Sequence, residues 1–428
     1  MNNLKQLVLP LLCLFVGMEV KSQGINFEKN LNWDQIQAKA KEQNKYIFVD
    51  AYTTWCGPCK AMSAEIFPKK EVGDFINDKF ISVKIQMDKT KSDDEFIKSW
   101  YADAKSLDQQ YNITAYPTIL FFSPEGNLAG RSVGYKNANK LIAEVKKAIA
   151  GSEEFRILYE QYKNAKRDSG FVKKLVELGQ QIGQTSISKA IAQQYIRSLN
   201  NQELFKKENL LFVHRFTTSP NDFGFKIFRK EGKMVNIVLG ANTAETKVRE
   251  VIIKEEIDPI VKDQTKIPDW VNIEKTIRSK YGAIGLEAYY GERMGFASEK
   301  KDWTNFGKFY ALYYTTAYSR SKFHINNISW PIFEYVNDPK VLDIAIKTMK
   351  YDIEHFDQKS LQAFDTYANL LYKSGKKQEA IEWESKALRL EEENALKNNS
   401  KPNPVFGETL EKMKTGVPTW PLVEPKKQ

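Results

Sequence analysis

Cysteine is scarce in this sequence, because the 428 residues include only Cys13, Cys56 and Cys59. Exported domains that depend on disulfides for their stability carry several pairs, so a disulfide-stabilised scaffold is excluded. Histidine is equally scarce, and its three positions lack metal-ligand spacing. A structural zinc site needs four ligands and the Cys56–Cys59 pair offers two, so we expect no metal.

Long runs of one charge sign are also missing. The net charge is +10 over the whole chain, and no zinc finger or other nucleic-acid motif occurs. We therefore expect no nucleic-acid partner. A diluted basic excess is typical of a solvated surface, and weak attraction to acidic partners or a membrane surface is the alternative.

One apolar run, from Leu7 to Val16, stands out near the start of the chain, after Lys5. It is too short to span a bilayer, and residues suited to a cleavage site follow it. The pattern predicts a signal peptide over residues 1–22 and a mature protein in the periplasm or secreted. A buried N-terminal helix is the alternative.

Removal of this segment takes Cys13 away and leaves Cys56 and Cys59 as the mature cysteines. A bridge that closes so short a loop restricts the unfolded chain little, so it adds little stability. The pair is therefore better explained by chemistry than by a structural role.

Residues 23–150 alternate strand and helix patterns, which indicates an α/β domain with a central sheet covered by helices. The predicted strands are Tyr46–Tyr52, Phe80–Met87, Thr118–Phe122 and Leu128–Val133, and the predicted flanking helices are Trp33–Lys45 and Lys140–Ile149.

The rest of the chain has the periodicity of helices. We expect a helical domain over residues 151–310, tetratricopeptide-like repeats over 311–395, and an extended or partly ordered proline-rich tail over 396–428. Small residues suggest the repeats, because they let paired helices approach closely. They are Ala368, Gly375, Ala380 and Ala387. An irregular helical bundle is the alternative.

Residues 49–60 read VDAYTTWCGPCK, and ITAYPT and VG follow at 113–118 and 133–134. Together these segments resemble the thioredoxin family. The resemblance implies an α/β thioredoxin-like fold, followed here by an all-α, tetratricopeptide-like domain. It covers about a third of the chain, and the combination of motifs is highly specific.

The motif has a physical interpretation of its own. A strand ends near Tyr52 and a helix begins near Cys56, so the free N–H groups of the helix start favour a thiolate there. Cys56 is then the nucleophile that forms a mixed disulfide, and Cys59, one turn later, releases it.

The resemblance assigns further residues. Asp50, on an apolar strand, would exchange a proton with Cys59 and have a raised pKa, and Lys84 would approach it from the next strand. The alternatives are a strand-end cap for Asp50 and a solvent-facing lysine. A substrate groove with a cis-proline is also implied, although a trans proline remains open. The groove residues are Trp55, Gly57, Pro58, Tyr116, Pro117 and Gly134.

Two departures from the family pattern affect the groove. Ala64 replaces the usual helix-kinking proline, and a helical insertion occupies residues 89–110. The segment FPKKEV at 67–72 is similar to a branch that includes the C-terminal domain of membrane-embedded thiol–disulfide interchange reductases.

The sequence thus predicts an exported thiol–disulfide oxidoreductase that reduces protein disulfides, with the Cys56–Cys59 disulfide in place of any cofactor. Its partners would be disulfide-containing proteins and a thiol donor protein, membrane-bound or not. The alternatives are a partner-binding helical scaffold, a redox-linked chaperone, and a disulfide isomerase or oxidase.

Overall fold

A computed structural model describes residues 24–165, 167–262, 268–317, 321 and 323–421. The predicted signal peptide, residues 1–22, lies outside the described residues. The chain divides into two compact units, and the division falls between Tyr195 and Ile196, inside the last turn of a helix that is described with the first unit.

The first unit contains a four-stranded sheet with the order β2-β1-β3-β4. Its strands are β1 (Tyr46–Tyr52), β2 (Phe80–Gln86), β3 (Thr118–Phe122) and β4 (Leu128–Val133). β1 is parallel to β2 and antiparallel to β3, and β4 is antiparallel to β3. The predicted strands are confirmed to within one residue, because runs of apolar and β-branched residues form strands that are buried on both faces.

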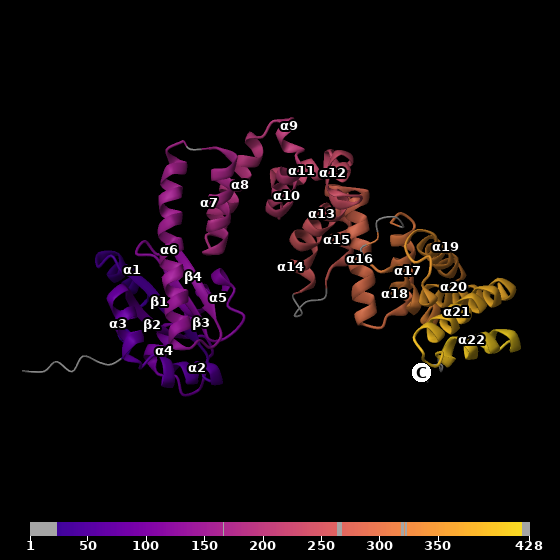
Figure 1. Cartoon of the computed structure of the whole chain (residues 1–428), viewed down its shortest axis with the longest axis horizontal. Helices are drawn as coiled ribbons and strands as arrows, with labels where there is room; N and C mark the ends of the chain where they lie inside the picture. Colours follow the sequence, from indigo (N-terminus) through magenta and orange to yellow (C-terminus); the bar gives the residue numbers. More distant parts are fainter. Residues whose placement is uncertain (1–23, 166, 263–267, 318–320, 322, 422–428) are drawn as a thin grey trace, which may run out of the picture. The chain divides into compact units, whose positions relative to one another are not determined.

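Helices cover both faces of this sheet (Figure 1). The helices of the first unit are α1 (Trp33–Glu42), α2 (Gly57–Ala61), the π-helical turn η1 (Met62–Ile66), α3 (Lys70–Lys79), α4 (Glu95–Ser99), α5 (Tyr101–Tyr111), α6 (Ala138–Lys163), α7 (Ser169–Gln181) and α8 (Thr185–Ser198). Alternate strand residues point to opposite faces. Phe48 therefore packs with η1, α3 and α6, whereas Ile47 and Val49 pack with α1 and α5.

The domain boundary expected at residue 150 falls inside α6, which continues without a break to Lys163. A single glycine does not end a helix whose apolar face continues, and Phe155 and Tyr162 extend that face as buried residues. Gly151 also sits at a close approach, because a Cβ there would lie 3.0 Å from Ile182 Cγ2. The outer half of α6 packs against α7 (Figure 1).

The described part of the second unit contains helices and no strand. Its helices are α9 (Asn201–Leu204), α10 (Lys207–Phe216), α11 (Phe223–Lys230), α12 (Gly232–Leu239), α13 (Thr243–Ile252), the π-helical turn η2 (Ile253–Ile257), α14 (Asp258–Val261), α15 (Trp270–Tyr281), α16 (Ala283–Glu299), α17 (Trp303–Tyr314), α18 (Ile325–Tyr335), α19 (Pro339–His355), α20 (Leu361–Lys373), α21 (Lys377–Lys397) and α22 (Pro404–Thr415).

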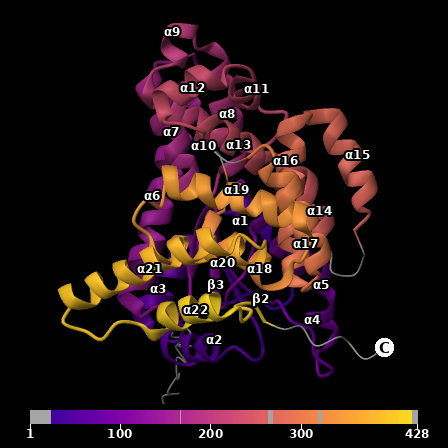
Figure 2. The same ribbon diagram turned by 90° about the vertical axis from the view of Figure 1, so that its right-hand side faces the viewer.

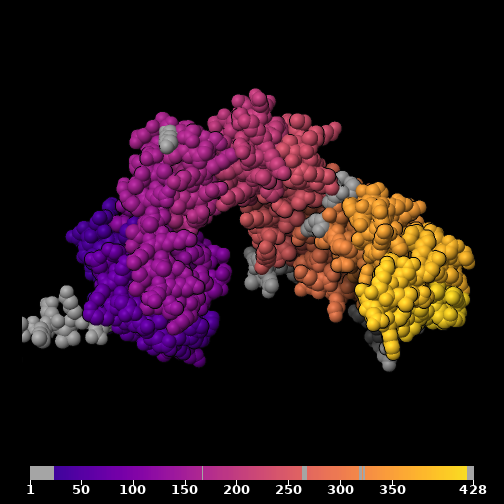
Figure 3. Space-filling model, in the orientation of Figure 1, coloured from indigo at the N-terminus to yellow at the C-terminus, as the bar shows by residue number. Residues whose placement is uncertain are grey.

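The last four helices pack in chain order, each against the next (Figure 2), and their colours pass from orange to yellow at the surface in Figure 3. Gly375 turns the chain between α20 and α21 with a positive φ of 82°, and Ala368, Ala380 and Ala387 are fully buried. The helix pair therefore forms with its small residues inside, while its assignment to the tetratricopeptide class stays a prediction.

Within the predicted tail, Pro404–Thr415 form α22, so this part is ordered rather than extended, and of the two forms expected only the extended one is wrong here. Asn403 caps the helix through its side chain. Phe406, Leu410 and Met413 form its buried face, and α22 packs against α21. An apolar face with helical spacing outweighs the local bias of the flanking prolines, since proline is well tolerated at the first turn of a helix.

Candidate active site

The two mature cysteines lie where β1 passes into α2. Cys56 is the N-cap of α2, and the backbone N–H of Cys59 donates to Cys56 Sγ at 3.1 Å. The two sulfurs are joined in a disulfide, and each cysteine is only 3% exposed. A donor at the start of a helix, aimed at sulfur, stabilises a thiolate relative to a thiol.

Asp50 lies in the middle of β1, with Lys84 of β2 as its register partner. Its side chain is 1% exposed, and Lys84 Nζ lies 3.2 Å from Oδ2. Burial raises the pKa of Asp50, and the ammonium of Lys84 opposes this shift in part. This direction agrees with the prediction, and the strand-end position is excluded because β1 continues to Tyr52.

Lys84 is surrounded by groups that stabilise its charge. Its Nζ donates to Ser63 Oγ at 2.6 Å and lies 5.0 to 5.5 Å from the ring centres of Tyr52, Phe27 and Phe67. Cation–π contacts of this kind hold an ammonium in place. The solvent-facing alternative for Lys84 is wrong, and the sequence did not reveal this aromatic cage.

A π-helical turn, η1, follows α2 and takes the position of the missing proline kink. It contains Ala64, and it places Ser63 toward Lys84 while Met62 and Ile66 enter the core. Single π-helical turns often occur at functional sites. Nothing in the local sequence signals this turn.

The loop before β3 lies beside the cysteine motif. The Tyr116–Pro117 peptide bond is cis, so the trans alternative is wrong. The rings of Tyr116 and Trp55 meet edge to face at 5.9 Å, and the N–H of Gly134 donates to the carbonyl of Pro117 at 2.8 Å. The structure therefore brings the cis-proline loop, the start of the cysteine motif and the end of β4 together.

The rim of this region is open to solvent. Trp55 is 70% exposed, Gly57 and Pro58 are exposed, and a Cβ at Gly57 or Gly134 would meet no atom within 4 Å. Backbone that is accessible in this way can pair with an extended peptide. The predicted groove residues thus include exposed backbone next to the cysteine motif, and their role in binding substrate stays a prediction.

The insertion forms α4 and α5, and polar contacts that the sequence did not reveal tie both Asp88, just before it, and Asp93, within it, to neighbouring segments. Asp88 accepts hydrogen bonds from the backbone N–H and the hydroxyl of Thr54. Asp93 accepts from Gln86 Nε2 at 3.0 Å and from Tyr101 Oη at 2.6 Å. The backbone N–H and the hydroxyl of Thr90 also donate to Asp93, and they lower its pKa more than the bond from Tyr101 does. The bond to Asp93 raises the pKa of Tyr101 to about 12.

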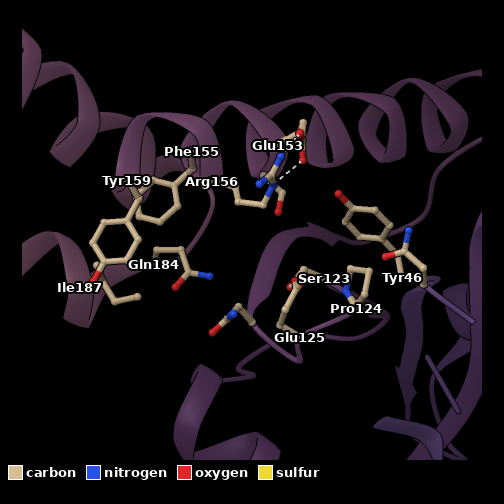
Figure 4. Close-up of a pocket in the computed structure, with 13 residues that line it drawn as sticks. Tyr46, Ser123, Pro124, Glu125, Glu153, Phe155, Arg156, Tyr159, Gln184 and Ile187 are labelled. Carbon is tan, nitrogen blue, oxygen red and sulfur yellow. Dashed lines mark hydrogen bonds and ion pairs between the residues drawn. The ribbon is translucent and has the colours of Figure 1, made fainter. Parts of the chain in front are cut away.

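The first unit also has a pocket away from the cysteines. It lies near the start of β1, at the opposite end of the strand (Figure 4). Its volume is about 490 Å³, and its lining includes Tyr46, Arg156 and Tyr159. It contains no cysteine and is separate from the disulfide. Within the described ranges, no group of three or more His, Cys, Asp or Glu side chains is placed to hold a metal ion.

A mixed sheet with a disulfide-forming pair after its central strand, facing a cis-proline loop, defines the thioredoxin-fold class. A family model for a thioredoxin-like domain matches residues 33–149. A thioredoxin of Mycoplasmoides gallisepticum is 30% identical over 98 residues, which are 23% of this chain and 79% of that protein. The chain belongs to the thioredoxin family.

Larger relatives match the same region. The thiol:disulfide interchange protein DsbD of Colwellia psychrerythraea is 34% identical over 110 residues, which are 25% of this chain. This chain spans only 16% to 20% of the length of such DsbD proteins. The solved C-terminal domain of Neisseria meningitidis DsbD, in its oxidised form, is matched over 26% of this chain and 89% of that domain, with 19% identity and a TM-score of 0.21.

None of the helices in the described part of the chain combines the length and the apolar character that crossing a bilayer requires.

Proposed function

We propose that the protein is an exported thiol–disulfide oxidoreductase that reduces disulfides in proteins. In the reduced enzyme the Cys56 thiolate attacks a substrate disulfide, forms a mixed disulfide and expels one substrate thiolate. The Cys59 thiolate then attacks Cys56 Sγ and releases the second substrate thiolate. Two electrons pass to the substrate, and the enzyme ends with the Cys56–Cys59 disulfide.

The observation that carries this proposal is the hydrogen bond from the Cys59 N–H to Cys56 Sγ at the start of α2. It favours charge on Cys56, which the attacking sulfur needs. A purely structural thioredoxin-like domain has no need for a second sulfur within one helical turn of such a donor.

Asp50 is proposed to accept the proton of Cys59 and return it, and Lys84 is proposed to adjust the pKa of Asp50. A carboxyl whose pKa is raised by burial can take a proton near neutral pH and return it. Lys84 limits the rise because its ammonium stabilises the ionised form. Extended substrate is proposed to bind over Trp55, Gly57 and Pro58 and beside Tyr116, Pro117 and Gly134.

The direction of transfer follows from the residues between the cysteines. Gly57 and Pro58 add no charge and no side-chain donor, so Cys56 is activated only moderately and its disulfide is comparatively stable. We propose that no other cofactor takes part. A thiol donor protein, soluble or membrane-bound, would keep the pair reduced outside the cytoplasm, where the predicted signal peptide directs the chain.

Two measurements test the proposal. The reduced protein should accelerate the reduction of insulin disulfides, and failure to do so at any concentration would contradict the activity. Equilibration with glutathione or dithiothreitol buffers gives the reduction potential of the pair. A value above about −180 mV, the range of a disulfide isomerase, would reject the reductive direction and favour an isomerase or oxidase.

We expect Asp50→Asn to slow insulin reduction about tenfold or more, because it removes the proposed proton acceptor. The same change should stabilise the fold above pH 4. Folding raises the pKa of Asp50 above its ordinary value of 3.8, so the ionised carboxyl destabilises the native state, and asparagine avoids this cost. The gain should vanish below that value, where Asp50 is protonated in both states.

Turnover and thermal unfolding between pH 3 and 8 check this expectation, with Asp74→Asn as the control. Asp74 is exposed on α3 and pairs with Lys70 at the surface, so its change should alter neither quantity. Full activity of Asp50→Asn between pH 6 and 8 would remove the proposed role.

The scaffold alternative rests on the second unit, whose successive helices could hold a polypeptide partner near Cys56. Because α6 runs through residue 150 and the first unit extends to Tyr195, the informative truncation is after Leu199, beyond α8. The shortened protein should still reduce small disulfides and should act more weakly on the natural partner. Equal action on that partner would remove the binding role of the second unit.

A further inference from the structure

A pocket in the second unit is lined by residues from three parts of its chain. The start of α13 contributes Asn242 and Thr246, and the end of α19 contributes Asp352, Phe356 and Asp357. Ser321, Phe323, His324 and Ile325 complete the lining at the start of α18. The volume is about 310 Å³, at the lower end of the range for small-ligand pockets.

Asp352 is the unusual member of this lining. It is 3% exposed, and its Oδ2 is buried without a hydrogen-bond partner among the described residues. An unsatisfied buried carboxylate oxygen destabilises the native state unless something pairs with it. Burial, reinforced by the neighbouring Asp357 carboxylate, raises the pKa of Asp352 to about 7, so the group can ionise when a cation arrives.

The other charged groups of the pocket do not supply that cation. His324 Nε2 lies 3.7 Å from Asp357 Oδ2, and the histidine side chain is 58% exposed at the rim. His324 therefore lies against Asp357 rather than against Oδ2 of Asp352, although its charge and the Asp357 side chain both act on Asp352. The pocket is acidic at its base although the whole chain carries a net charge of +10.

The apolar residues of the lining indicate which kind of cation fits the pocket. Phe356 is 59% exposed, and Phe323 and Ile325 also line the pocket. A planar guanidinium stacks on aromatic rings and pairs with two carboxylates at once, whereas an ammonium is a strongly hydrated point charge. Two carboxylates beside aromatic rings therefore suit arginine better than lysine.

We propose that this pocket binds a guanidinium group, and specifically the arginine side chain of a polypeptide partner. The buried Oδ2 of Asp352 accepts from the guanidinium, Asp357 shares it, and the phenylalanine rings lie against its plane or its methylene stem. This site would give the second unit a recognition function that does not depend on the cysteine chemistry.

Calorimetric titration of the full chain tests this with three probes: Nα-acetyl-arginine amide, the uncharged Nα-acetyl-citrulline amide, and a ten-residue Gly/Ser peptide with one central arginine. We expect the arginine amide and the peptide to bind, and citrulline to bind about tenfold more weakly or not at all. Equal binding of citrulline, or no binding of arginine, overturns the proposal. Binding of the amide without the peptide overturns the polypeptide assignment.

Asp352→Asn should weaken binding of both arginine probes about tenfold. It removes a buried charge, so the fold should be kept or stabilised, and thermal unfolding checks this. Asp343→Asn is the matched control, because Asp343 lies on the same helix, is 52% exposed and pairs with Lys347. Unchanged binding in Asp352→Asn overturns the proposal. Reduction of a small uncharged disulfide should be normal in both variants, so failure of this site and failure of the redox proposal are separable.

Discussion

Cys56→Ser should lower insulin reduction to the rate of the buffer alone. The substitution removes the sulfur that receives the hydrogen bond at the start of α2, and a serine hydroxyl neither ionises near neutral pH nor forms a mixed disulfide. Cys59 keeps its thiol in this variant, but it lacks the hydrogen bond that Cys56 Sγ receives at the start of α2, so we expect it not to replace Cys56 as the attacking group. Insulin turbidity and reaction with a small aromatic disulfide measure the loss.

Cys59→Ser should have a different result. Attack by Cys56 still proceeds, but the releasing thiol is absent, so mixed disulfides with natural partners should accumulate and appear as slower bands on non-reducing gels. Cys13→Ser, a change at the cysteine outside the motif, is the matched control and should behave as the native chain. If Cys56→Ser traps partners and Cys59→Ser traps none, the two roles are reversed.

Glu287→Leu should destabilise the second unit by about 3–5 kcal/mol. Glu287 on α16 and Arg249 on α13 form an ion pair in which each residue is 2% exposed. The substitution leaves the guanidinium buried with its hydrogen bond to the Thr246 hydroxyl but without a carboxylate, and a buried charge without its counter-charge is costly. Chemical denaturation measures the free energy of unfolding. Hydrogen exchange of the amides in α13 and α16 shows whether the loss of stability is local to these helices.

Two variants make this result specific. Adding Arg249→Met to Glu287→Leu should recover most of the stability, because two apolar side chains can replace a buried pair at little cost. Glu250→Ala should change the stability little, since the Glu250 side chain is exposed and lies 3.6 Å from Lys247, at the long end of ion-pair distances. A loss below about 1 kcal/mol for Glu287→Leu would show that the pair contributes no more than a surface pair.

Much of the first unit follows from short stretches of sequence. The run at Tyr46–Tyr52 becomes a strand because its apolar residues can be buried on both faces of a sheet. Cys56 and Cys59 are recognisable because their spacing is a local property, set by one turn of helix. The cis geometry at Pro117 was likewise implied by the family motif and is present.

Contacts between residues far apart in the sequence decided the surroundings of the active-site residues. Ser63 and Lys84 lie 21 positions apart and meet only because η1 packs over β2, and Gly134 reaches Pro117 only through the pairing of β3 with β4. The aromatic cage of Lys84 joins Phe27, Tyr52 and Phe67 from separate segments. Sequence patterns over a few residues contain no information about contacts between such distant segments.

The sequence by itself determined the class of the first unit, its strands and the cysteine pair, because periodicity and motif spacing act over a few residues. Tertiary structure alone decided that α6 continues through residue 150, that Pro404–Thr415 form a helix, and that Asp352 is buried at the base of a pocket. The physical reason is the same in each case. Burial depends on which distant surfaces meet, and the free energy of that burial outweighs the weaker local preferences.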